Sequence, residues 1–225
     1  MIGYKLLRGD LTSISHAPGR VQYGHDWVEV PGKGAYVGLT LPGLLRGGLG
    51  KVLARVEYKS PTGAVNDGDV ITARRVRVLQ HAPLDLWALV RAAIWGARQV
   101  LPPKGHPFRP ACVQAIRAAE ECERERTLAA ANAVWAARWA VEAAEAAEEV
   151  ASRWGAVKKV DAAAASALRA ALWAAESAKR AVAWEVGIAE EAAAEAASWS
   201  AARAAGAKGA ALARRILERF AKEVF

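Results

Sequence analysis

The sequence predicts an α+β protein, in which a small mixed β-sheet domain over residues 1–82 precedes an Ala/Trp-rich α-helical bundle over residues 83–225. Three observations support this division. All nine prolines lie at or before position 110, and 15 of the 19 glycines lie at or before position 105. Residues 111–225 contain 44 alanines among 115 positions, and alanine has the highest helix propensity. Alternation of apolar and charged residues, which is typical of strands, occurs in the first part of the chain.

The first domain is predicted to contain four or five strands and one short helix. Residues 51–59 alternate between apolar and charged side chains, which predicts a half-buried strand. Turn-forming residues at 61–63 and 66–69 separate this strand from another over 70–79. The remaining predicted strands and the short helix cover residues 4–7, 27–30, 34–40 and 42–45.

The helical part is predicted to contain four to six helices. Pro83 suits the first turn of a helix over residues 84–101, and the Pro-rich loop 102–110 follows it. Thr127 and Asp161 are predicted N-caps of two long helices, the first of which ends at Gly155. The sequence leaves open whether Gly187 interrupts the second of them. Further helices are predicted over residues 110–125 and 210–224.

Tryptophans at helical spacing mark a stripe along this alanine framework. Alanine buries little area, so the large indole side chains supply most of the apolar surface. We interpret the stripe as core, with a partner surface or a contact with a second copy of the chain as the alternative. Its members are Trp135, Trp139, Trp173, Trp184 and Trp199.

The net charge of +8 is concentrated in the first 110 residues, which hold 15 basic and 7 acidic residues, against 16 of each in residues 111–225. Cations on the predicted strands and the glycine-rich loop could form one basic patch, as phosphate binding requires. The alternative is a solvated sheet face. Few aromatic residues are interleaved with these cations, so base stacking is not expected. The patch would contain Arg46, Lys51, Arg55, Lys59, Arg75 and Arg77.

The sequence offers no catalytic or metal-binding motif, so we expect a non-enzymatic protein without a cofactor or metal. The glycine-rich stretch 43–52 lacks the spacing and the Ser/Thr of a phosphate-binding Walker loop. Four scattered histidines have no ligand spacing. The absence of a long apolar run or a signal peptide predicts a cytosolic protein without membrane contact. Cys112 and Cys122 lie too far apart on one predicted helix for a disulfide and are expected to be reduced.

The N-terminal part resembles a small uncharacterised domain of phage proteins. The resemblance covers residues 3–80 and rests on the segments 3–13, 21–24, 34–37 and 51–57 and the basic strand 68–79. Where that domain has a phrase with His and Cys, this chain has Gly34-Ala35-Tyr36-Val37-Gly38, so any chemistry of those two residues is absent. The resemblance implies a phage or mobile-element association and no defined activity.

The C-terminal part resembles the alanine-rich helical proteins labelled immunity proteins. The segments that carry this resemblance are the Arg-Pro phrase 109–120 and the residues 181–184 and 189–192. That family often has His where this chain has Val186 and Glu191, so no site is transferred. The resemblance implies neutralisation of a partner by binding.

Together these observations favour an interaction protein that binds a macromolecular partner, most simply another protein, in a host-defence context. The alternative is a nucleic-acid-binding protein that uses the basic face of the first domain. A homo-oligomer stays open, because the Trp/Ala surface could pack against another copy.

Overall fold

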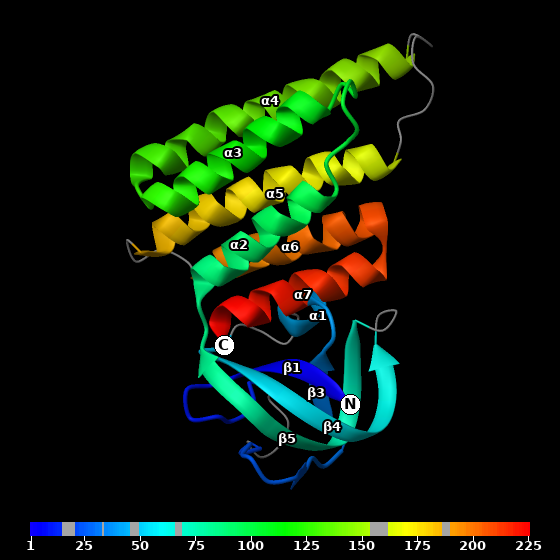
Figure 1. Cartoon of the computed structure of the whole chain (residues 1–225), viewed down its shortest axis with the longest axis vertical. Coiled ribbons are helices and arrows are strands. Elements are labelled where there is room, and N and C mark those ends of the chain that lie inside the picture. The colour runs from blue at the N-terminus through cyan, green and yellow to red at the C-terminus, as the bar shows by residue number, and fades with distance from the viewer. Residues whose placement is uncertain (15–20, 33, 46–49, 66–68, 154–161, 186–189) are drawn as a thin grey trace. The chain divides into compact units, whose positions relative to one another are not determined.

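The computed structural model describes residues 1–14, 21–32, 34–45, 50–65, 69–153, 162–185 and 190–225 (Figure 1). It has the predicted α+β fold, with an antiparallel sheet followed by helices. The chain divides into two compact units. The first contains Met1–Asp85 together with Leu217–Phe225, and the second contains Leu86–Ile216.

Five strands and one short helix make up most of the first unit. The strands are β1 (Ile2–Leu7), β2 (Val28–Glu29), β3 (Ala35–Gly38), β4 (Val52–Val65) and β5 (Val70–Pro83), and the helix is α1 (Leu41–Leu45). β1 pairs with β3 and β4, and β5 pairs with the same two strands, so these four strands form a closed ring. β2 adds to β5 beyond the end of β3. Every pairing between these strands is antiparallel, which corrects the mixed sheet that the sequence predicted.

β4 and β5 are both longer than the alternation pattern predicted. β4 continues through the segment expected to be a turn, and its register against β5 shifts between Pro61 and Gly63. A proline cannot donate a ladder hydrogen bond, and such an irregularity is where a strand tolerates one. The hydroxyl of Thr62 donates to Thr72 Oγ1 at 3.1 Å and holds the two strands together there.

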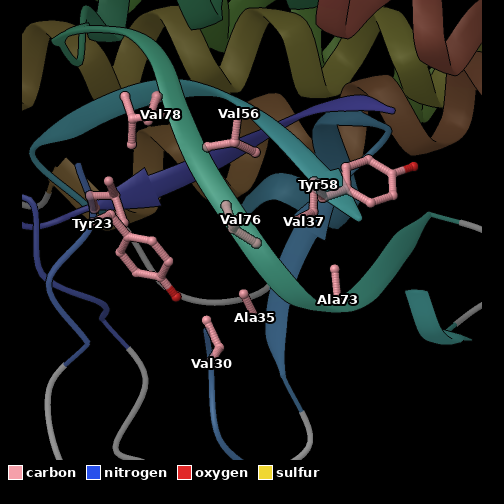
Figure 2. Close-up of a cluster of buried hydrophobic side chains, with 11 residues drawn as sticks. Tyr23, Val30, Ala35, Val37, Val56, Tyr58, Ala73, Val76 and Val78 are labelled. Carbon is pink, nitrogen blue, oxygen red and sulfur yellow. The ribbon is translucent and has the colours of Figure 1, made fainter. Parts of the chain in front are cut away.

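The inner face of the strands encloses the core of this unit. Figure 2 shows side chains from several strands and from the loop before β2 gathered there. The buried cluster consists of Leu7, Tyr23, Val30, Ala35, Val37, Ala54, Val56, Tyr58, Ala73, Val76 and Val78. On β4 and β5 these residues alternate with polar ones, so the half-buried strand predicted over residues 51–59 is confirmed.

A lysine is also buried in this unit. Lys5 has 8% of its surface exposed, its amine donates to the backbone oxygen of Tyr36 at 3.0 Å, and it lies 5.2 Å from the ring centre of Tyr23. Burial lowers the pKa of Lys5 from 10.5 to about 8, because the charged amine loses its hydration. The protonated side chain therefore lowers the stability of the fold at neutral pH.

We expect Lys5→Met to raise the free energy of unfolding at pH 7, by at most ~3 kcal/mol. Between the folded pKa of about 8 and the unfolded value of 10.5, the folded protein binds fewer protons, so the wild type gains stability as the pH rises. The advantage of the variant should therefore shrink across that window. Urea unfolding of both proteins from pH 7 to 10 measures this difference, and two parallel curves would contradict it.

Five helices make up most of the second unit. They are α2 (Leu86–Gln99), α3 (Arg109–Glu125), α4 (Leu128–Arg153), α5 (Ala162–Glu185) and α6 (Glu190–Lys208). α5 contacts each of the other four. The predicted N-cap is confirmed, because Thr127 Oγ1 accepts the N–H of Ala130 at 3.2 Å. Gly155, Asp161 and Gly187 lie outside the described residues.

Small residues let the helices of this unit pack closely. Ser177 on α5 donates to the backbone oxygen of Ala193 on α6 at 3.1 Å, and Ser200 on α6 donates to that of Ala170 on α5 at 2.9 Å. A serine hydroxyl reaches the backbone of the next helix only where the two helices are close. Cys112 and Cys122 are free and buried, as expected, and burial raises the pKa of each thiol to about 12.

The last helix, α7 (Ala210–Val224), follows Gly209, which has a φ of 90°. Near its start, Arg215 lies 5.4 Å from the ring centre of Trp95 on α2. The later residues of α7 and the residue after it, Leu217–Phe225, group with the strands of the first unit. Consistent with this, the charge of Glu218 contributes to the raised pKa of Tyr4 on β1, although burial is the larger cause.

Candidate functional site

The outer surface of β5 and its neighbours carries polar side chains in two rows. In the first row, Arg77 on β5 lies opposite Glu57 on β4, and the strand register continues to Trp27, the residue just before β2. In the second row, Arg75 lies between Glu29 on β2 and Lys59 on β4. Because alternate residues of a strand share a face, both rows point away from the core.

Trp27 lies among three cations of these rows. The Nζ atom of Lys59 is 4.5 Å from its ring centre, and the Cζ atoms of Arg77 and Arg75 are 5.0 Å and 5.6 Å away. Each distance is within the range in which an aromatic ring attracts a cation. We call Trp27, Lys59, Arg75 and Arg77 the Trp27 cluster. Trp27 is half-buried, so part of its indole ring is open to solvent.

The three cations differ in their other partners. Arg77 forms an ion pair with Glu57, with its Nε and Nη2 atoms 2.8 Å and 2.7 Å from the same carboxylate oxygen. Within the described part of the chain, neither Lys59 nor Arg75 forms an ion pair. These two lie directly opposite each other on neighbouring strands, an arrangement in which like charges repel. An anion bound between them would relieve this repulsion.

The other residues of the predicted basic patch are not part of this cluster. Lys51 directly precedes β4 and is eight residues from Lys59, a separation of about 26 Å in an extended chain. Arg55 lies opposite Tyr4 on β1, where it acts on the pKa of the phenol. Arg46 lies outside the described residues. The structure therefore brings together Lys59, Arg75 and Arg77 and separates Lys51 and Arg55 from them.

Sequence reasoning missed Trp27, because it found few aromatic residues interleaved with these cations along the chain. Trp27 is 32 residues from Lys59 and 48 from Arg75 along the chain, and only the pairing of β2 with β5 brings them together. The available signal was a tryptophan at the first position of the predicted strand 27–30. The structure thus places an aromatic residue among Lys59, Arg75 and Arg77, which the sequence pattern did not predict.

The two structural units share the net charge differently from the two halves of the sequence. The first unit has 13 basic and 9 acidic residues, and the second has 18 and 14, so each has a net charge of +4. The cut at residue 110 assigned Arg91, Arg98, Lys104 and Arg109 to the first half, although all four lie in the second unit. Net charge therefore does not favour the strand unit, and the local arrangement around Trp27 carries the argument.

The tryptophan stripe of the helical unit lies partly at the surface. Trp199 on α6 is 45% exposed, and Trp173 on α5 is half-buried. Their rings stack, with centres 6.3 Å apart. The interpretation of these two residues as core is therefore wrong for Trp199 and partly wrong for Trp173. The side chains of Trp135, Trp139 and Trp184 lie outside the described residues.

The remaining chemistry of the described residues is limited. No group of three or more His, Cys, Asp or Glu among them could hold a metal ion. None of the helices within the described ranges is long and apolar enough to cross a membrane. A hollow of about 890 Å³ beside α3 is lined by Arg109, Val113 and Arg117 among others.

No protein family, curated protein or solved structure matches this chain. The predicted protein partner and the two resemblances stay predictions.

Proposed function

We propose that this protein binds single-stranded nucleic acid through the Trp27 cluster. The observation that carries the proposal is the position of one half-buried indole ring beside two cations that lack carboxylate partners in the described chain. Phosphates bind cations, and every nucleobase has a flat face that stacks on an aromatic ring. The cluster offers both interactions within a few ångströms.

The residues of the Trp27 cluster would have different roles in binding. Lys59 and Arg75 face each other across two strands, so a backbone phosphate between them would accept hydrogen bonds from both. Trp27 would stack on the base next to that phosphate. Arg77 is already paired with Glu57, and it would hold the ring in place rather than bind phosphate.

The geometry favours a single strand over a duplex. Bases in a duplex are stacked on each other, so a ring on a sheet surface has no free base to stack on. In a single strand the bases can turn toward Trp27 while the phosphates follow the cations. An affinity for duplex DNA below that for a single strand of the same length is therefore part of the proposal.

Fluorescence anisotropy of a labelled oligothymidine of about 12 nucleotides tests the proposal at ~50 mM salt. We expect binding that weakens as salt rises. Lys59→Glu and Arg75→Glu should each weaken binding at least about tenfold and lower the salt dependence by about one counterion. Trp27→Ala should cost ~1–3 kcal/mol, and Trp27→Phe should restore part of that loss.

Lys51→Glu is the matched control, because it makes the same charge change directly before β4, at an exposed site outside the cluster. We expect it to change affinity by less than about threefold. A lack of salt-sensitive binding would overturn the proposal. Equal losses in Lys51→Glu and Lys59→Glu would also overturn it, because they would indicate attraction by net charge alone.

A further inference from the structure

The exposed side of α6 carries a row of three side chains, Glu195, Trp199 and Arg203, spaced four residues apart. Residues at this spacing are neighbours on a helix surface, about 6 Å apart along the axis. The row runs from an acidic residue through an exposed tryptophan to a basic residue. Among the residues that the structure describes, neither Glu195 nor Arg203 forms an ion pair.

Trp199 is held in place although it is exposed. Its ring stacks on Trp173 of the adjacent helix α5, and its Nε1–H donates to Glu195 Oε1 at 3.4 Å. The guanidinium of Arg203 is 5.9 Å from its ring centre. A large side chain that is already ordered loses little conformational entropy when a partner covers it. This property is typical of the tryptophans that anchor protein interfaces.

Small residues flank the row on α6. Ala192 and Ala202 are half-buried, and Gly206 is exposed. None of them projects far enough to keep another helix away. A second helix could therefore approach α6 closely on either side of Trp199.

We propose that α6 packs against α6 of a second copy of this chain in an antiparallel, two-fold symmetric dimer. In this dimer the two-fold axis passes beside Trp199. The axis places position 195 of one copy opposite position 203 of the other, because both are four residues from Trp199. Each Glu195 then lies opposite an Arg203 of the other copy, and the two Trp199 rings meet at the axis. The row on one copy is thus complementary in charge to the same row on the other copy, as an interface between identical copies requires.

The packing of two helices permits this arrangement. Rows of residues spaced by four run obliquely to the helix axis, and two such rows lie along each other when the helices cross at about 50°. The buried Nε atom of Arg203 has no hydrogen-bond partner within the described chain. The pairing would place a carboxylate beside the guanidinium of Arg203, which forms no ion pair within the described chain.

Sedimentation equilibrium of the full chain at micromolar concentrations tests the proposal. The wild type is expected to dimerise. Glu195→Arg places two positive charges opposite each other in the dimer, and Arg203→Glu places two negative charges opposite each other. Each variant alone should therefore have a dimer dissociation constant at least about tenfold higher than the wild type.

Mixing the two variants gives the decisive result. In the mixed dimer, both arginines of the Glu195→Arg chain face both glutamates of the Arg203→Glu chain, so an equimolar mixture should dimerise about as tightly as the wild type. Glu121→Arg, at an exposed site on α3, is the matched control and should leave the dimer unchanged. Circular dichroism of each variant checks that the helices form.

Three results would overturn the proposal. They are a wild type that stays monomeric up to about 100 μM, a charge-reversed variant that dimerises alone as tightly as the wild type, and a mixture that stays monomeric while both variants are folded.

Discussion

Replacing Phe220 with alanine is expected to lower the free energy of unfolding of the first unit by about 3–5 kcal/mol. Phe220 has no exposed surface and lies in the segment Leu217–Phe225, which groups with the strands. Removing its ring leaves a cavity that the surrounding backbone cannot fill. Hydrogen exchange followed by mass spectrometry locates the destabilised unit, because each exchanging amide belongs to one unit. We expect faster amide exchange in β1 and β4.

Phe225→Ala is the matched control. It removes the same ring from the same end of the chain, but Phe225 is only half-buried. We expect a cost of about 1 kcal/mol or less. Equal costs for the two variants would contradict the prediction. Faster exchange confined to α2–α6 would show that the C-terminal segment stabilises the helical unit instead.

Gly34→Ala is expected to destabilise the first unit by about 1–3 kcal/mol more than Gly32→Ala. Both glycines have a positive φ, 87° for Gly34 and 69° for Gly32, so alanine is strained at either position. A side-chain carbon at Gly34 would also lie 2.7 Å from the backbone oxygen of Ala73, whereas one at Gly32 would meet nothing within 4 Å. The close contact is with backbone in β5, which cannot move without breaking the sheet.

The comparison isolates the close contact from the backbone strain, which the two variants share. All four tyrosines lie in the first unit, so tyrosine absorbance during urea unfolding reports on that unit. Equal midpoints for Gly34→Ala and Gly32→Ala would mean that β3 can move away from β5. That result would contradict the tight pairing of Ala35 with Ala73.

Local sequence patterns predicted the elements well where the determining interaction is local. The N-cap Thr127 was correct because its hydroxyl bonds to an amide only three residues away. The alternation over residues 51–59 identified the buried face of β4. The end of β4 was wrong, because its continuation past Pro61 depends on a shifted register against β5, which no local pattern records.

The candidate sites were less predictable for the same reason. Half of the predicted basic patch, Lys59, Arg75 and Arg77, does meet, but the tryptophan among these residues was not identified. The tryptophan stripe was assigned to the core from its spacing. Trp199 is nevertheless exposed. The sequence did not reveal this, because alanines occur on every side of α6 and the spacing of its residues does not distinguish the buried side of the helix from the exposed side.

The sequence by itself determined that strands precede helices, which residues of β4 face the core, and where several helices begin. These features follow from backbone propensity and from the periodicity of neighbouring residues. Only the tertiary structure decided that Trp27 lies beside Lys59 and Arg75, that Leu217–Phe225 belongs with the strands, and that the net charge is shared equally between the two units. Each of these depends on strand pairing or packing between distant segments, which local periodicity does not specify.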